Sequence, residues 1–507
     1  MIHLMQTAIC TVENWSTLTG FTFSSEKTRG NLFSKLRPPS PPVLKLYNQN
    51  IAFQATIEYL GMIFDQKLAW KDHTPSLIQE SHKTLGLLKT LAHHHWESDS
   101  EMLFRLYRSL IHSKIDYGSL AYSSAKSSAL APLNSLHNTA LLAEPSLLLR
   151  RDFLLLSYSL KKAADVAHPL HKLIFSRRSQ LIFTQKTSLC SPAYHRLSLL
   201  LHELNYSLPV FFPKPPQIFP PWVRGYLQFT LHLGDSSVTS NNDCTIAECF
   251  QAILADIPDS FIIYTDGSMT TEGVGAAYAI PSGKQLYRLP VTSSILIAEL
   301  VAISAAVQDD SLPNTPHHNI VICIDSMNSS KLLGQMYPTC VLVQQIHYQL
   351  ALLHQTGKDI HFLWTPSHQD SDGNDQFDAA VKLAMTHPTS TLMPHSTDSD
   401  VKLHLKERLY HNWQITWNST TSPVKRIKSC ITNWVHCPHS RRDEIVVARL
   451  RLGHTRLATS FYLVQPYITH RTILVLDLTL EGLLANSSSA KDRALSFLKA
   501  TQLHSQI

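Results

Sequence analysis

Short apolar runs and longer segments of helical periodicity alternate between residues 256 and 388. The runs at 261–264 and 319–324 are continuous, as expected of strands buried on both faces of a sheet. The segment from Leu296 to Val307 repeats apolar residues every three or four positions, which predicts a helix with one apolar stripe. Further runs predict a hairpin at 273–280 and 285–289, a helix around 343–353, a strand at 360–364 and a last helix from about 374. This order predicts an α/β unit with a mixed sheet and helices on its faces.

The rest of the chain has a different pattern. The pattern of residues 1–150 predicts an initial loop and strand section followed by helices. The pattern of residues 151–255 predicts a helical and proline-rich connector. The tract from Pro209 to Pro221 is so dense in proline that we expect a stiff linker or an edge segment. Residues 389–507 predict a linker and then a helical tail.

Composition narrows the class of protein only a little. The 507 residues include 44 basic and 38 acidic ones, a net charge of +6 that is compatible with a polyanionic partner but does not establish one. The eight cysteines are scattered without a CxxC pair, which favours a reducing, intracellular location, cytoplasmic or nuclear. No segment has the roughly 18 consecutive apolar residues of a membrane span, so we expect no membrane association.

One group of cysteines and histidines has the residue types of a zinc site. Cys430 and Cys437 lie near His436 and His439, but the spacing is wide and no second pair follows. We therefore expect no zinc site there.

Four acidic residues in the α/β unit carry the candidate chemistry. Asp266 follows an apolar strand, Glu299 lies at the margin of a helix stripe, Asp325 follows a second strand, and Asp378 lies in the first turn or two of the last helix. Four such carboxylates in one compact unit would repel each other unless a cation lay among them, and oxygen-only ligands suit a hard divalent cation. A single acid after a strand is more often a helix cap, and Asp325 alone would be interpreted in that way.

The motifs around these acids resemble a type 1 ribonuclease H domain of the form carried by non-LTR retrotransposons. The matching motifs, in chain order, are Tyr264-Thr265-Asp266-Gly267-Ser268, Gly273-Val274-Gly275, Ala298-Glu299-Leu300, Ile324-Asp325-Ser326, Trp364-Thr365-Pro366-Ser367-His368 and Gly373-Asn374-Asp375-Gln376-Phe377-Asp378. The sequence departs from the family pattern at Asp375, where Glu is usual, and at Phe377, where a small residue is usual. Asp370 and Asp372 add negative charge to the loop of His368.

The resemblance implies a fold, a cofactor and a substrate. The fold would be α/β, a ribonuclease H-like mixed sheet of five strands with flanking helices. Asp266, Glu299, Asp325 and Asp378 would hold two Mg²⁺ ions, with Mn²⁺ as the alternative metal, and His368 would assist proton movement or product release. The substrate would be the RNA strand of an RNA–DNA hybrid, read through groove shape and 2′-hydroxyls. No membrane or small-molecule substrate is implied.

The flanking regions also resemble parts of such elements. The segments 20–28, 59–65, 68–73, 107–113 and 116–118 resemble the end of a retrotransposon reverse transcriptase, its last palm strands and thumb. Because no Tyr/Phe-x-Asp-Asp motif precedes residue 20, we expect a truncated remnant without polymerase activity. The segment 447–457 resembles the tail of these elements, with no cysteine after Cys437 to form a zinc knuckle. Its basic residues could contact phosphates, although an amphipathic helix with a solvated face explains them equally well.

Two functions remain open on this basis. The first is a metal-dependent RNA–DNA hybrid endoribonuclease within a retrotransposon polyprotein fragment. The second is a catalytically silent nucleic-acid-binding remnant of the same element. Retention of the four carboxylates and His368 favours the first.

Overall fold

The computed structural model divides the chain into two compact units, which we describe separately. It describes residues 2–34, 40–92, 100–140, 145–175, 181, 191–216, 227–230, 253, 255–364, 385, 387–419 and 430–431. The first unit draws on Met1–Leu156, Ser176–Leu200 and Arg408–Ile507, and the second on Ser157–Phe175 and Leu201–Glu407.

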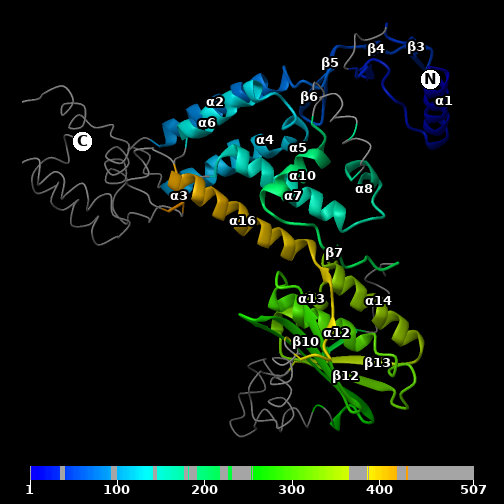
Figure 1. Cartoon of the computed structure of the whole chain (residues 1–507). Helices are drawn as coiled ribbons and strands as arrows, with labels where there is room; N and C mark the ends of the chain where they lie inside the picture. Colours follow the sequence, from blue (N-terminus) through cyan, green and yellow to red (C-terminus); the bar gives the residue numbers. More distant parts are fainter. Residues whose placement is uncertain are drawn as a thin grey trace, which may run out of the picture. The chain divides into compact units, whose positions relative to one another are not determined.

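The first unit is mainly helical (Figure 1). Its helices are α1 (Ile2–Thr19), α2 (His73–Leu91), α3 (Ser100–Tyr107), the π-helical turn η2 (Arg108–His112), α4 (Ser113–Asp116), α5 (Ser119–Tyr122), α6 (Ser127–Ala140), most of α7 (Leu147–Ala163) and most of α10 (Ala193–Glu203). Its short strands are β1 (Arg29–Gly30), β2 (Lys45–Leu46), β3 (Gln49–Asn50), β4 (Ala52–Phe53), β5 (Thr56–Tyr59) and β6 (Met62–Asp65). The core of this unit gathers on α2 and the helices from α3 to α6, with Ile111, Tyr122 and Leu133 fully buried.

The start of this unit corrects the sequence prediction. The chain begins in helix α1 rather than in a loop and strand section. Ile2, Met5, Ile9 and Val12 recur at helical spacing and no proline or glycine interrupts residues 2–19, so the signal was present in the sequence. Helix α2 is one of the helices predicted for this part of the chain, and its Leu77, Leu85 and Leu88 are buried.

The second unit is built on a seven-stranded mixed sheet with strand order β14-β11-β10-β9-β12-β13-β8. The strands are β8 (Leu227–Thr230), β9 (Ser260–Thr270), β10 (Gly273–Ile280), β11 (Gly283–Leu289), β12 (Asn319–Ile324), β13 (Asp359–Trp364) and β14 (Thr391–Leu392). The helices are α8 (Pro169–Ile174), α12 (Ile295–Val307), α13 (Met327–Leu333), α14 (Val341–Gln355) and the start of α16 (Asp398–Ser419). The mixed α/β fold and the five strands from β9 to β13 agree with the prediction, and two edge strands are added.

The pairing of the central strands explains the mixed character of the sheet. Strand β9 runs antiparallel to β10 and parallel to β12, and β12 runs parallel to β13. Strands β10 and β11 form the predicted hairpin, with Gly283 at a φ of 156° just after the turn. A residue with a side chain would be strained at that φ, so the glycine has a conformational role there.

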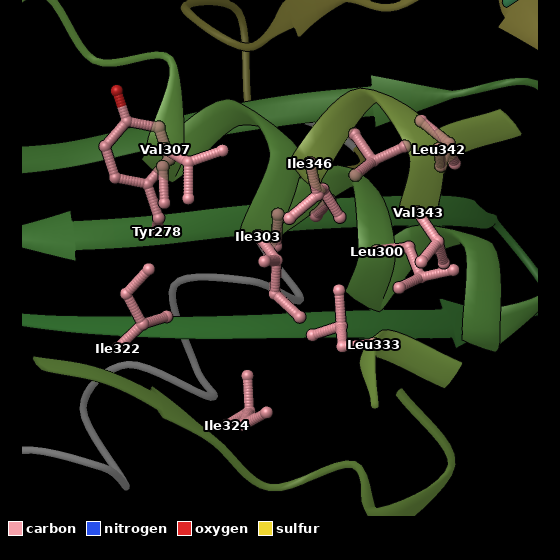
Figure 2. Packing of buried hydrophobic residues seen from close by; sticks show 14 of the residues in the cluster. Tyr278, Leu300, Ile303, Val307, Ile322, Ile324, Leu333, Leu342, Val343 and Ile346 are labelled. Carbon is pink, nitrogen blue, oxygen red and sulfur yellow. The ribbon is translucent and has the colours of Figure 1, made fainter. Parts of the chain in front are cut away.

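Helix α12 lies at the centre of the core of the second unit. Figure 2 shows Leu300, Ile303 and Val307 of α12 among residues of the sheet and of α14. The predicted single apolar stripe underestimates this burial, since residues 297–304 are all buried. The reason is that α12 packs against β9, β10 and α14.

Segments predicted as linkers take part in this unit. Strand β7 (Val210–Phe211) pairs in parallel with β15 (His395–Ser396), and Phe212, in the proline-rich tract, is 6% exposed and belongs to the core. Residues 391–392 pair with β11. The proline-rich tract is therefore more than a linker at this point, because it pairs with β15 and contributes Phe212 to the core.

Candidate metal centre

The register between β9 and β12 brings Asp266 next to Asp325. Tyr264 pairs with Cys323 and Thr265 with Ile324, so the next position on each strand is an aspartate. The hydroxyl of Thr265 also donates a hydrogen bond to the carbonyl oxygen of Cys323, at 3.1 Å. This side-chain bond ties the two strands together one residue before the acids.

Asp266 does not end its strand, which corrects the sequence prediction. Strand β9 continues through Asp266 to Thr270 because β10 pairs with it along this length, with Ala277 opposite Asp266. What ends near Asp266 is the pairing with β12, whose last residue is Ile324. Asp266 therefore lies inside a strand, at the point where β9 loses β12 as one of its two neighbouring strands.

Glu299 reaches the same point from helix α12, and Gly267 allows the approach. A Cβ atom placed on Gly267 would lie 2.5 Å from the amide nitrogen of Glu299 and 2.8 Å from the carbonyl carbon of Ala298. Real side chains do not tolerate such a contact with backbone, so only glycine lets α12 pack this closely on β9. The Glu299 side chain is 5% exposed, and a buried carboxylate is costly without compensating partners.

Asp325 lies in the connection between β12 and α13. The residue that caps α13 is Ser326, whose hydroxyl accepts a hydrogen bond from the amide of Ser329 at 3.2 Å. The alternative interpretation of Asp325 as a helix cap is therefore wrong. The indole nitrogen of Trp364, at the end of β13, donates a hydrogen bond to the carbonyl oxygen of Asp325 at 2.8 Å and fixes this backbone from the neighbouring strand.

The three carboxylates converge. Asp266, Glu299 and Asp325 each offer one oxygen, and these oxygens all lie within 4.8 Å of one another. Three negative charges at this separation repel strongly when they are partly or fully buried. An all-oxygen donor set of mixed burial fits a hard divalent cation such as Mg²⁺ or Mn²⁺ and does not fit a thiolate-seeking metal.

The remaining predicted site residues lie outside the described residues. Asp378 and His368 belong to this group, as do the departures from the family pattern at Asp370, Asp372, Asp375 and Phe377. The cluster around Cys437 and the basic segment at 447–457 also lie outside it. Their roles stay predictions.

The positioning roles of Gly267 and Trp364 were not predicted from the sequence. Gly267 directly follows an acid inside an apolar strand, and a glycine in a strand often marks a close approach of another backbone. Trp364 closes an apolar strand, and its indole N–H needs an acceptor when it is partly buried. Neither signal identifies the partner, because the partner comes from a distant segment.

Among the described residues, no helix is long and apolar enough to cross a membrane. A comparison with curated proteins found no match. A comparison with protein families found that residues 258–386 match the RNase H family model, which is the second unit's sheet from β9 to β13 with its helices. This stretch is an RNase H domain, a type of nuclease domain that acts on RNA–DNA hybrids.

Proposed function

We propose that this domain hydrolyses the RNA strand of RNA–DNA hybrids internally, in a metal-dependent reaction with two cations. The observation that carries the proposal is the convergence of Asp266, Glu299 and Asp325 within 4.8 Å inside an RNase H domain. The three acids come from β9, α12 and the β12–α13 connection, so the fold itself assembles them.

The described residues supply the ligands and their support. Asp266, Glu299 and Asp325 would hold the metal, and Asp378 is proposed as the fourth ligand from its place in the sequence. When bound, the cations would supply the positive charge that stabilises the attacking and leaving oxygens of an in-line phosphoryl displacement. His368 is proposed to move a proton or assist product release. Thr265 and Trp364 hold the two backbones that carry Asp266 and Asp325.

The substrate follows from the kind of chemistry and not from base recognition. A hybrid duplex presents 2′-hydroxyls on one strand only, and a protein distinguishes RNA from DNA through them. We therefore propose that the RNA strand is cut with little sequence preference and that neither duplex RNA nor duplex DNA is a good substrate.

We also propose that the chain is part of a non-LTR retrotransposon polyprotein and carries no polymerase site. The adjacent aspartates in the sequence are Asp309 and Asp310. The carboxylate of Asp309 accepts hydrogen bonds from the Tyr278 hydroxyl at 2.6 Å and from the Ser311 amide at 2.9 Å. These bonds hold Asp309 just after the end of α12, which supports a structural role for it rather than a catalytic one.

Purified full-length protein and an end-labelled RNA–DNA hybrid test the proposal. We expect internal cleavage of the RNA strand with Mg²⁺, none with EDTA, and none with the Asp266→Asn variant. The control variant Glu272→Gln removes an exposed carboxylate from the turn between β9 and β10 and should cleave normally. Binding of the hybrid without cleavage at any Mg²⁺ or Mn²⁺ concentration would instead establish the silent remnant.

A further inference from the structure

The N-terminus of helix α12 is held by a carboxylate from outside the matched domain. Asp400, in the first turn of α16, accepts a hydrogen bond through Oδ2 from the backbone amide of Ser294 at 3.1 Å. Ser294 is the N-cap residue of α12, and its hydroxyl does not cap the helix. The two residues are 106 positions apart in the chain.

Asp400 is built into this position. It is 6% exposed, and its own amide donates a hydrogen bond to the Thr397 hydroxyl at 3.2 Å. Burial raises the pKa of Asp400, and hydrogen bonds from Ser294 and Thr397 oppose that shift. The next residues of α16 that face the protein, Val401 and Leu405, are fully buried, so the carboxylate is anchored by packing.

The physical effect of such a group on a helix is known. The first turn of a helix carries partial positive charge and unsatisfied N–H groups, and a carboxylate there stabilises the helix end. Ser294 and Glu299 are five residues apart, about 7.5 Å along a helix axis. A group that fixes Ser294 therefore also fixes the height of Glu299 above the sheet.

The packing of α12 against β9 leaves the helix little room to move. The absent Cβ of Gly267 leaves room for the backbone at Glu299 with nothing to spare, so a small shift of α12 either collides with β9 or moves the Glu299 carboxylate away from Asp266. Within this packing, the Gly267 contact limits the distance of α12 from β9, and the Asp400 contact fixes its N-terminal end.

We propose that Asp400 is a positioning residue of the metal centre, which acts on Glu299 through the N-terminus of α12. This inference rests on the proposed metal site. It places an essential support of the site beyond residue 386, where the family match ends. It also gives Asp400, in a segment predicted as a linker, a role in the nuclease domain.

The test compares Asp400→Ala, Asp400→Asn and Asp398→Asn in the full-length chain. Asp398→Asn removes the same charge from the same turn of α16 and serves as the matched control. Asp400→Asn keeps an oxygen that can accept from the Ser294 amide, so it is the conservative rescue. For each protein, Mn²⁺ binding is measured by calorimetry in the absence of nucleic acid, and Mg²⁺ dependence and KM for the hybrid are measured in cleavage.

We expect Asp400→Ala to weaken Mn²⁺ binding about ten-fold and to raise the Mg²⁺ requirement of cleavage similarly, at unchanged KM for the hybrid. Asp400→Asn should lose less than Asp400→Ala, and Asp398→Asn should match the wild type. Circular dichroism identifies a variant that fails to fold. If Asp400→Ala is unfolded, the comparison of Asp400→Asn with Asp398→Asn decides.

The outcomes separate this inference from the proposed function. If the wild type binds Mn²⁺ without cleaving hybrids, the proposed function fails, and weaker Mn²⁺ binding by Asp400→Ala alone still supports the inference. If the wild type cleaves and the Asp400 variants bind and use metal like Asp398→Asn, the inference is overturned. A wild type that binds no Mn²⁺ overturns both.

Discussion

Gly267 of β9 lies directly against the backbone of Glu299 in α12, at a distance that leaves no room for a methyl group. This contact sets how close the helix comes to the strand, and therefore how close the Glu299 carboxylate comes to that of Asp266. A strand residue without a side chain is thus a precondition for the convergence of these acids.

The first prediction concerns this contact. Gly267→Ala should push α12 away from β9, lower hybrid cleavage about 100-fold because the ligands are misplaced, and cost about 1–3 kcal/mol of stability through overpacking. Steady-state cleavage and denaturant unfolding measure the two effects. Gly273→Ala, at the start of the neighbouring strand β10, is the control. Its Cβ would lie 3.9 Å from Met385, which is an ordinary contact. Equal activity of the two variants would contradict the packing argument.

The second prediction uses the repulsion among the three acids. Glu299→Gln removes one of the converging charges, so in EDTA the free energy of unfolding of the variant should exceed that of the wild type by on the order of 1 kcal/mol. The variant should therefore melt at a higher temperature in EDTA. Mg²⁺ should stabilise the wild type by binding to the folded state, and should stabilise the variant little. Calorimetric melting with EDTA and with Mg²⁺ provides the four values. A variant that melts lower than the wild type in EDTA would show that the acids are not repelling each other.

The third prediction concerns the support of Asp325. Trp364→Phe removes the indole N–H that binds the Asp325 carbonyl oxygen but keeps an aromatic ring. We expect a loss of about 1 kcal/mol in stability and a fall in metal affinity of about ten-fold. Mn²⁺ calorimetry measures the second effect. A variant with reduced stability but unchanged Mn²⁺ affinity would limit Trp364 to a folding role.

The fourth prediction concerns pH and the first unit. His73 is buried, and its ring lies 5.9 Å from that of Trp70 and 5.4 Å from that of Tyr122. Burial lowers its pKa below the ordinary 6.5, and Glu80 only partly offsets this. The unfolded chain therefore binds the proton more tightly than the folded chain does. Above pH 6.5 the neutral ring costs no stability. As the pH falls from 6.5 toward the folded pKa, the free energy of unfolding decreases by up to about 1.4 kcal/mol per pH unit.

Denaturant unfolding followed by tryptophan fluorescence from pH 7.5 to pH 5 measures this loss. His73→Asn, which keeps an acceptor for the Ile63 amide, should flatten the pH dependence of the first unit. His82→Asn, on the exposed side of the same helix, should keep it. Identical pH profiles for the two variants would assign the effect to another group.

The sequence predicted those parts of the fold that depend on local patterns. The bounds of β12 follow from its continuous apolar run, and the β10–β11 hairpin follows from its turn residues. The same patterns misplaced Asp266 at a strand end, because the continuation of β9 depends on pairing with β10 and not on its own composition.

The contacts that support the site could not be predicted from local sequence patterns. The identity of the three converging acids was inferred from their order and from family motifs, but their supports come from contacts between distant segments. Strands β7, β14 and β15, of two residues each, and Phe212 within a proline-rich tract carry no periodic signal. That these segments belong to the fold becomes clear only from the strands with which they pair and the core that they contact.

The two outermost strands, β8 and β14, have a practical consequence for anyone who isolates the nuclease. Both lie outside residues 258–386 and cover the edges of β13 and β11. A fragment cut at the limits of the family match would expose two rows of unpaired backbone donors and acceptors, which favours edge-to-edge self-association. Fragments that begin before residue 227 and continue past residue 400 should remain monodisperse at concentrations where the shorter fragment precipitates.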